Sequence, residues 1–452
     1  MIRLHLRISQ RCFGSAVSTA AGKTKEKIVI LGSGWGGYQL LRKLDLSKYD
    51  VTVVSPRNHF LFTPLLASTC VGTLEFRGVI EAVRSPNQPV NYYQAKAVAF
   101  DFQNRTIACV PSSRYDTSAN ASASASGPST FSVPYDKLVI AVGAKNNTFS
   151  IPGVEENAHF LKEIGDARKI REDLLDNFER ASAPGMSDKD RKDILHCVIV
   201  GGGPTGCEVA AEIHDFITQD LRKVFPSAVV ADTRLTLVEA GSAILSGFDE
   251  KLSSFAQKHF SKQLIELKLK MKVLRVEKDY ILVQNQNGAQ EKIPYGLLIW
   301  STGIAPRDVI TATTGLKKHA SGRVLVDSQL QVEGLQNVFA IGDTAAVRTD
   351  TSPNGKILPA TAQVASQQGK WLAKHFNAGS RDDFHYQHVG MLAYVGSHKA
   401  LVDLTGVKAT GFGAWLFWRS AYLTNLVSIR NKLLVPMYWF KTLLFGRDVT
   451  HF

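Results

Sequence analysis

Two glycine-rich segments have the residue types and the spacing that bind a dinucleotide. Both follow the pattern G-x-G-x-x-G, and the six glycines are Gly32, Gly34, Gly37, Gly201, Gly203 and Gly206. Each segment comes after a short apolar run, typical of a buried parallel strand, and leads into a stretch with helical spacing. In that context glycine lets the backbone approach a pyrophosphate, and the N–H groups at the helix start face its charge.

Two such units in one chain predict two Rossmann-type domains that hold two dinucleotides, a flavin and a nicotinamide. The alternative for either loop is a tight turn without a ligand. Glu239 ends the strand after the second loop, where a carboxylate can bond a ribose diol and repel a 2′-phosphate, which favours NADH over NADPH. The strand after the first loop ends in Ser55, Pro56 and Arg57 without an acid.

Three more apolar runs end in turns that suit a flavoprotein. The first contains Gly143, the second contains Gly303, and the third ends in Gly342 and Asp343. We expect Asp343 to bond the ribityl chain of a flavin, while the adjoining helix start meets the pyrophosphate. The predicted fold class is therefore α/β, with two Rossmann-type dinucleotide-binding domains and amphipathic helices at the C-terminus.

Composition limits the other functions. The 452 residues allow two or three domains, and a net charge of +13 suits nucleic acid, an anionic membrane or a basic targeting segment. The sequence has no lysine/arginine run and no zinc-finger pattern, so we expect no nucleic-acid partner. The five scattered cysteines read as free thiols, and His385 and His388 lack a second ligand pair, so we expect no metal.

The first 25 residues contain no acid and carry arginines at a spacing of four, with apolar residues between them. This is the pattern of a mitochondrial transit peptide, and residues 1–25 are predicted to be one; the alternative is a disordered basic tail. An uninterrupted apolar core is absent, which argues against a secretory signal.

The order of the motifs resembles that of the type II (alternative, rotenone-insensitive) NADH:quinone oxidoreductases, which are glutathione-reductase-like flavoproteins. The resemblance runs from about Glu26 to the C-terminus and is carried by GSGWGG, SPRNHFLFTPLL, GGGPTGCEVAAEI, QDLRKVFP, LVEA, IPYGLLIWSTG, FAIGD and PATAQVASQQG. The Ser/Ala-rich stretch Val110–Pro134 departs from the pattern and reads as a surface insert between strands. No EF-hand pattern occurs, so we expect no calcium dependence.

The resemblance implies non-covalent FAD as cofactor, NADH as substrate and ubiquinone as acceptor, without proton pumping. It implies an FAD-binding domain at 26–150 and 326–390, the second part with the quinone-site helix, and an NADH-binding domain at 151–325. Gln363 and Gln367 would border the quinone pocket, and Glu208 would lie near the nicotinamide. The helix N-terminus at Ala362 and Gln363 would stabilise negative charge on the reduced flavin.

The C-terminal region, residues 391–452, is predicted to anchor the protein to a membrane. On a helix, Trp415, Trp418, Tyr422, Leu426 and Ile429 form one stripe. Aromatic residues beside Arg419 and Arg430 suit a helix that lies in the lipid interface. We therefore expect a monotopic protein of the mitochondrial inner membrane that faces the matrix. The alternative is a packed helical hairpin or a dimer interface, and a homodimer is expected.

Two rival functions share the fold. A sulfide:quinone oxidoreductase needs a pair of cysteines beside the flavin, and no cysteine follows Cys207. A non-catalytic NADH-binding flavoprotein would need neither the AQVASQ motif nor an anchoring tail. Absence of NADH-dependent quinone reduction by the FAD-loaded protein would favour that second rival.

Overall fold

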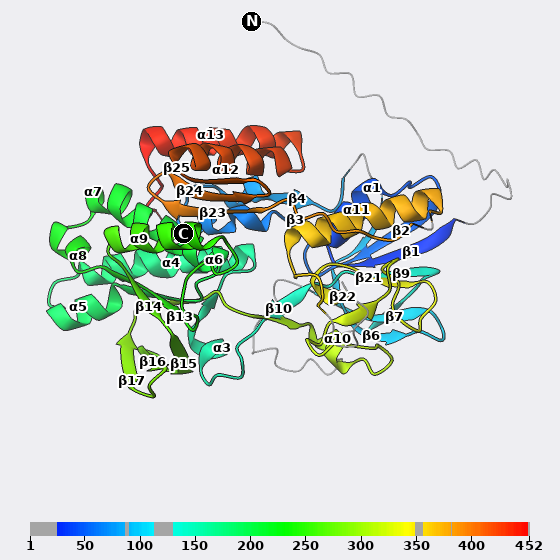
Figure 1. Ribbon diagram of the computed structural model, residues 1–452, viewed down its shortest axis with the longest axis horizontal. Coiled ribbons are helices and arrows are strands. Elements are labelled where there is room, and N and C mark those ends of the chain that lie inside the picture. The colour runs from blue at the N-terminus through cyan, green and yellow to red at the C-terminus, as the bar shows by residue number, and fades with distance from the viewer. Residues whose placement is uncertain (1–24, 86–89, 113–129, 349–355, 381, 451–452) are drawn as a thin grey trace, which may run out of the picture.

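The computed structural model describes residues 25–85, 90–112, 130–348, 356–380 and 382–450. The predicted transit peptide lies outside these ranges except for its last residue, and so does Cys12. The described chain folds as an α/β protein built on two separate parallel sheets, with a C-terminal layer of antiparallel strands and two helices above them (Figure 1).

The first parallel sheet contains the strand before the first glycine loop. Its order is β21 (Val338–Ala340), β9 (Lys137–Ile140), β1 (Glu26–Leu31), β2 (Tyr49–Val54) and β5 (Asn91–Tyr93). All four pairings are parallel, and β1 is buried along Ile28–Leu31, as an apolar central strand should be. Because β21 comes from late in the chain, two distant parts of the sequence build this unit.

The second parallel sheet contains the strand before the second glycine loop. Its order is β11 (His159–Phe160), β18 (Leu297–Trp300), β12 (His196–Val200), β13 (Arg234–Glu239) and β14 (Ile265–Leu269). All five residues of β12 are buried. Each sheet therefore presents a glycine loop at the carboxyl end of a central strand, which is where ligands bind in folds of this kind.

Smaller sheets connect and cover these units. They are β10 (Ala144–Asn146) with β19 (Ile304–Pro306); β3 (His59–Leu61) with β4 (Ile80–Ala82); β20 (Val324–Val326) with β22 (Ala345–Val347); β6 (Ala95–Asp101), β7 (Thr106–Pro111) and β8 (Phe131–Pro134); β15 (Met271–Val276), β16 (Tyr280–Asn285) and β17 (Gln290–Pro294); and β23 (Met391–Gly396), β24 (Lys399–Leu404) and β25 (Val407–Gly411). Residues 131–134 of the predicted Ser/Ala-rich insert form β8, which pairs antiparallel with β7, and residues 113–129 of the insert lie outside the described residues.

Most helices follow the strands that they cover. The helices are α1 (Trp35–Lys43), α2 (Leu66–Thr69), α3 (Val154–Asn157), α4 (Ile164–Ala181), α5 (Asp188–Ile194), α6 (Pro204–Phe216), α7 (Arg222–Val224), α8 (Ser227–Ala231), α9 (Glu250–Lys262), α10 (Asp308–Ala312), α11 (Ala362–Ala378), α12 (Phe412–Asn425) and α13 (Ile429–Phe445). A π-helical turn, η4 (Ile217–Leu221), extends α6. α11 begins as expected, because Thr361 caps it by accepting a bond from the Val364 N–H at 3.3 Å.

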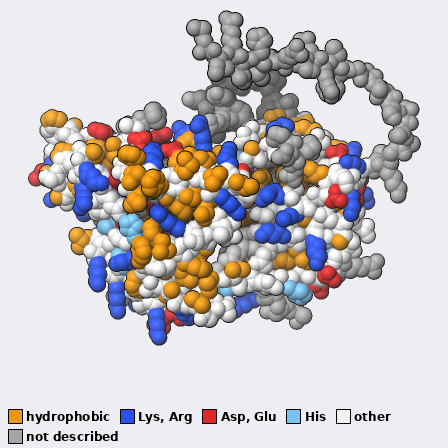
Figure 2. Space-filling model, turned by 90° about the horizontal axis from the view of Figure 1, so that it is seen from above, with side chains coloured by type: hydrophobic (Ala, Val, Ile, Leu, Met, Phe, Trp, Pro, Cys, Tyr) orange, Lys and Arg blue, Asp and Glu red, His pale blue; other side chains and the backbone are white. Residues whose placement is uncertain are grey.

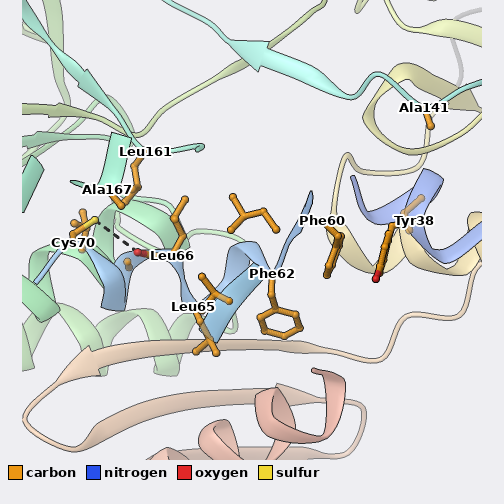
Figure 3. Close-up of a cluster of buried hydrophobic side chains, with 14 of the residues drawn as sticks. Tyr38, Phe60, Phe62, Leu65, Leu66, Cys70, Ala141, Leu161 and Ala167 are labelled. Carbon is orange, nitrogen blue, oxygen red and sulfur yellow. Dashed lines mark hydrogen bonds between the residues drawn. The ribbon is translucent and has the colours of Figure 1, made fainter. Parts of the chain in front are cut away.

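The two helices at the first glycine loop pack unusually closely. A Cβ at Gly369 of α11 would lie 2.3 Å from the Gly36 oxygen of α1. Next to them, Tyr38 of α1 stacks on Phe60 of β3 with ring centroids 4.8 Å apart, and Phe62 lies further along the same segment (Figure 3). These buried contacts fix the segment between β3 and α2 against α1, and this segment leads to the interface with α6.

Candidate cofactor and active site

A cavity of about 1130 Å³ runs along the carboxyl ends of both parallel sheets. Of the residues predicted from sequence, those that line it are Gly32, Gly34, Gly143, Glu208, Gly303, Asp343 and Ala362. Those that lie outside its lining are Gly37, Gly201, Gly203, Gly206, Glu239, Gln363 and Gln367. Residues from both Rossmann-type units therefore meet at one cavity, large enough for a drug-sized or larger ligand.

The first glycine loop has the geometry of a pyrophosphate cradle. Gly32 has a φ of +108°, and a Cβ there would lie 2.2 Å from the Ala141 oxygen. A Cβ at Gly37 would lie 2.1 Å from the Gly32 oxygen, so this glycine allows α1 to approach β1. The side of Gly34 is open apart from the Arg57 guanidinium at 3.6 Å, which leaves room for a ligand.

The second glycine loop repeats this geometry. Gly201 has a φ of +113°, and a Cβ at Gly206 would lie 1.9 Å from the Gly201 oxygen. Nothing lies within 4 Å of a Cβ built at Gly203, the middle glycine, so its side is open to a ligand. The three glycines of each loop thus divide their roles in the same way, for a turn, for ligand approach and for helix packing.

The charges around the cavity suit an anionic ligand. Arg57, Lys162 and Arg307 line it, and Arg57 pairs with Glu163 at 3.0 Å. Burial lowers the pKa of Lys162, although Asp343 raises it, and burial also lowers the pKa of Arg307. Half-buried cations beside the open side of Gly34 fit the diphosphate of a dinucleotide, so the residues present fit FAD.

Lys162, Glu163 and Arg307 were not predicted as site residues from the sequence. Lys162 and Glu163 lie two and three residues beyond the end of β11, and Arg307 directly follows β19, so all three lie close to the end of a strand. That position was the available signal, because strand ends of open α/β sheets carry ligand-binding residues. Beside the first loop, Ser33 Oγ lies 3.0 Å from Ser55 Oγ. Ser55 follows β2, at the strand end where the first unit has no acid to match Glu239 of the second unit.

Glu239 lies at the end of β13, next to the second glycine loop. Its carboxylate accepts bonds from the Gly202 N–H at 2.6 Å and the Gly241 N–H at 2.6 Å. The backbone therefore holds this negative charge in place beside the loop that would carry a nicotinamide dinucleotide. A fixed carboxylate there can select the diol of the cofactor ribose.

Glu208 lies in the first turns of α6 and faces the cavity. Its carboxylate accepts a bond from the Tyr394 N–H at 3.2 Å. Burial, together with the nearby charge of Glu212, raises the pKa of Glu208 to about 8. The Glu208 side chain is therefore suited to hold and release a proton near neutral pH.

Gln363 and Gln367 share one face of α11, as their spacing predicts. Gln363 Nε2 donates to the Gly390 oxygen at 2.6 Å, and Gln367 Nε2 donates to the Gln387 oxygen at 2.7 Å. Both amides thus bind the segment that leads into β23. Ala362, at the start of the same helix, lines the cavity.

Gln368 was not selected from sequence. It is fully buried, and its Oε1 accepts a bond from the Gly342 N–H at 2.6 Å, next to Asp343. This contact fixes α11 to the turn that contains Asp343, the residue predicted to bond the ribityl chain of the flavin.

Comparisons with known proteins agree with this geometry. The sequence profile of the pyridine nucleotide-disulphide oxidoreductase family matches residues 26–369, and that of the NDH2 C-terminal domain matches residues 388–448. The probable NADH dehydrogenase of Dictyostelium discoideum is 42% identical over 94% of this chain and 91% of its own length. The internal alternative NAD(P)H-ubiquinone oxidoreductase A1 of Solanum tuberosum is 42% identical over 94% of this chain and 88% of its own.

A solved structure leads to the same family. The structure of NDH2 from Plasmodium falciparum in complex with NADH has a TM-score of 0.86 and 30% identity, and the match covers 95% of this chain and 100% of that one. This chain is a type II NADH:quinone oxidoreductase. The sulfide:quinone oxidoreductase of Aquifex aeolicus, at 16% identity, shares the fold alone.

The C-terminal region of this family member forms a layer over α6 and α9 (Figure 1). The stripe predicted to face lipid instead faces the protein. Trp415, Trp418 and Leu426 are buried, and only Ile429 at its end is exposed. The prediction was wrong because α12 covers the β23–β25 sheet, and its aromatic face fills that interface.

A second set of apolar side chains, which shares only Ile429 with that stripe, is exposed on the outer face, here called the outer apolar face. Its members are Phe412, Leu416, Phe417, Ile429, Leu433, Met437, Phe440, Leu443, Leu444 and Phe445. From this side, Figure 2 shows hydrophobic side chains gathered over the helical layer with lysine and arginine among them. Within the described residues, no helix combines the length and hydropathy needed to cross a membrane.

Arg419 also differs from its prediction. Its guanidinium lies 4.0 Å from the ring centre of Trp415 and 4.5 Å from that of Trp439, so it stacks between α12 and α13. Burial lowers the pKa of Arg419 to about 10. Arg430 remains at the surface, where it donates to the Ile80 oxygen at 3.2 Å.

Proposed function

We propose that this chain oxidises NADH and transfers two electrons through non-covalently bound FAD to ubiquinone, without pumping protons. The observation that carries the proposal is the single cavity shared by both Rossmann-type units, with an open glycine cradle on one side and Glu208 on the other. The relatives named as NADH-ubiquinone or NAD(P)H-ubiquinone oxidoreductases support the same reaction.

The residues of the chain would divide the work by position. When bound in this cavity, FAD would supply the redox chemistry, which is acceptance of a hydride from NADH and donation of two electrons to a quinone. Gly32, Gly34 and the cations of the cavity hold the diphosphate, while Asp343 holds the ribityl chain. The N-terminus of α11 at Ala362 places its positive dipole end toward the cavity, where it stabilises negative charge on the isoalloxazine.

Glu208 would act at the substrates as a group that holds a proton. Its carboxyl lies in the cavity and is anchored by the Tyr394 N–H. Reduction of a quinone consumes protons as well as electrons, so a buried acid of raised pKa suits this step. Gln363 and Gln367 would border the quinone side indirectly, because they fix the 387–390 segment beside α11.

The site residues and domain boundaries complete the proposal. The FAD-binding unit is assigned to 26–150 and 326–390, the NADH-binding unit to 151–325, and the anchoring region to 391–452. The participation of β21 in the first sheet supports the divided FAD-binding unit.

We place the protein at the matrix face of the mitochondrial inner membrane as a monotopic homodimer. The outer apolar face suits shallow insertion into lipid, and the reaction supplies a reason, because ubiquinone resides in the bilayer. The matrix side is favoured by 42% identity to internal relatives against 39% to an external one. Protease protection in intact and opened mitochondria would test the orientation, and light scattering in detergent would test the dimer.

Reconstitution tests the proposed function. Purified protein in lipid vesicles should consume NADH when ubiquinone is present, while a pH-sensitive dye inside the vesicles reports no proton uptake. Denaturation should release FAD. A colourless protein, or NADH consumption that does not depend on quinone, would contradict the proposal.

A further inference from the structure

A row of buried carboxylates runs along α6 and the π-helical turn η4. Glu208, Glu212, Asp215 and Asp220 are all less than a tenth exposed. Buried carboxylates are costly unless they are paired or hydrogen-bonded, so each needs identified partners. Asp215 accepts hydrogen bonds from the Tyr394 hydroxyl and the Ser397 N–H. The partners of Glu212 and Asp220 come from elsewhere.

Arg447, just beyond α13, reaches into this row. Its side chain is 6% exposed and pairs with Asp220 at 2.8 Å and with Glu212 at 3.5 Å. It also donates to Thr73 Oγ1 at 2.8 Å and to Gln219 Oε1 at 3.1 Å. Burial opposes its charge, but Glu212 and Asp220 outweigh burial and raise the pKa of Arg447.

The backbone is built to bring Arg447 to this place. Gly446 has a φ of +77°, and a Cβ there would lie 2.6 Å from Asp220 Oδ1, so only glycine fits between α13 and the carboxylate. On the other side of Arg447, the Asp448 oxygen accepts a bond from Arg171 of α4 at 2.8 Å. Both neighbours of the arginine are therefore held against the dinucleotide-binding units.

Glu212 joins three parts of the molecule. It accepts bonds from Ser68 Oγ at 2.6 Å and Thr73 Oγ1 at 2.8 Å, from the segment that follows β3, and it pairs with Arg447 of the tail. Glu212 itself belongs to α6. Glu208 precedes it by four residues, so the two carboxylates share one face of the helix one turn apart. Only Glu208 faces the cofactor cavity.

We propose that Glu212 and Arg447 are positioning residues for the reaction. Their buried ion pair joins the C-terminal tail to α6 and sets the charge that Glu208 faces one helical turn away. The pair thereby governs whether Glu208 holds a proton. This inference rests on the proposed function, in which Glu208 acts at the substrates. It assigns to the tail a second task, inside the protein, apart from contact with lipid.

The surroundings of Glu208 explain why Glu212 controls it. The titratable groups that face Glu208 are Glu212 and Cys207 of α6 and Tyr422 of α12, while β23 supplies the Tyr394 N–H. No cation is among these neighbours in the described chain. Glu212 is held one turn away by Arg447 and two hydroxyls, and its negative charge opposes ionisation of Glu208.

Infrared titration of the FAD-loaded, full-length protein tests this inference directly. The carboxyl signal of Glu208 is identified by its loss in Glu208→Gln, and its midpoint pH is then measured in each variant. Glu212→Gln removes the negative charge one turn away, so the Glu208 midpoint should move to lower pH. Arg447→Lys keeps the positive charge and should keep the original midpoint.

A double variant protects the test against misfolding. Glu212→Gln with Arg447→Met removes both charges, which leaves no new unpaired cation against the row. It should show a smaller downward shift than Glu212→Gln alone, because the positive charge of Arg447 is removed as well. Lys408→Gln, which breaks the surface pair of Lys408 with Asp249 in the same C-terminal region, is the matched control and should shift nothing.

The outcomes are separable. An unchanged Glu208 midpoint in both Glu212→Gln and the double variant overturns the inference, even if these variants lose activity. A wild-type protein that cannot pass electrons from NADH to quinone overturns the proposed function instead, and the infrared titration still reports on the ion pair in that protein.

Discussion

Gln367 of α11 binds both backbone groups of Gln387. Its Nε2 donates to the Gln387 oxygen at 2.7 Å, and its Oε1 accepts from the Gln387 N–H at 3.0 Å. The side chain therefore acts like a neighbouring strand and fixes the segment that enters β23. Tyr394 of β23 in turn donates its N–H to Glu208. A glutamine outside the cavity is linked in this way to the acid inside it.

Gln367→Ala should slow quinone reduction more than reduction of the flavin by NADH. The loss of two backbone hydrogen bonds, at about 1 kcal/mol each, corresponds to roughly a tenfold or greater effect. Stopped-flow absorbance follows the two half-reactions separately. Lys370→Ala, on the exposed face of the same helix, is the control. Slower bleaching of the flavin by NADH, with normal reoxidation of the flavin by quinone, would contradict the assignment of Gln367 to the quinone side.

Glu239→Gln should raise the use of NADPH relative to NADH. The substitution keeps an oxygen for one backbone N–H but removes the charge that repels a 2′-phosphate. We expect the ratio of kcat/KM values to change by about tenfold or more. Glu291→Gln, an exposed carboxylate paired with Lys268, is a matched control. Equal ratios in Glu239→Gln and wild type would place the discrimination elsewhere.

Gly206→Ala should impair NADH binding while FAD stays bound. The added methyl would lie 1.9 Å from the Gly201 oxygen, so α6 must move away from β12. Gly37→Ala makes the equivalent clash at the first loop and should lower the FAD content instead. Gly165→Ala is the control, because nothing lies within 4 Å of a Cβ built there. FAD absorbance and NADH titration distinguish the two variants, and identical losses in both would argue against separate loops.

Glu208→Gln should stabilise the protein increasingly as pH rises. The pKa of Glu208 is raised to about 8 in the folded protein from an ordinary value of 4.5, so the folded state keeps a proton that the unfolded chain has released. Wild-type stability therefore falls between these two pH values, and glutamine escapes this loss. Denaturant midpoints of the two proteins should be close near the ordinary value and diverge above it. A constant difference across this range would contradict the raised pKa.

Polar substitutions on the outer apolar face should weaken membrane binding without changing the cavity. Leu433, Phe440 and Leu444 are exposed by 63%, 62% and 57%, so Leu433→Ser, Phe440→Ser and Leu444→Ser together disturb little packing. Sedimentation with lipid vesicles measures binding, and NADH bleaching of the flavin reports on the cavity. Removal of all residues from Gly413 is a poorer test, because it also removes Trp418 and Arg447. Undiminished binding by the triple variant would place the lipid contact elsewhere.

Local motifs were predictable from the sequence because their geometry is local. Gly32 and Gly201 need a positive φ, and Gly37 and Gly206 need a missing Cβ, so the pattern alone implies the loop. The cap of α11 by Thr361 is local in the same way, because it joins residues three apart in the sequence. The role of Glu239 remains a prediction, although its place beside the second loop agrees with it.

Contacts that depend on distant parts of the chain were not predictable. Helical periodicity identified the aromatic stripe of α12 but not which face the β23–β25 sheet would cover, so the stripe was assigned to lipid when it packs inward. Lys162 and Arg307 meet at the cavity only after both sheets have formed. The contact of Arg447 with Glu212 joins residues from the tail and α6 and leaves no trace in either local pattern.

Anaerobic stopped-flow with purified, FAD-loaded protein tests the central claim most directly. NADH is mixed first, in limiting amount, and a ubiquinone analogue is added second while the flavin absorbance is recorded. The account predicts bleaching by NADH followed by full recovery with the quinone, with one quinone reduced for each NADH oxidised. Bleaching that no quinone reverses, or a flavin that NADH does not bleach, would contradict it.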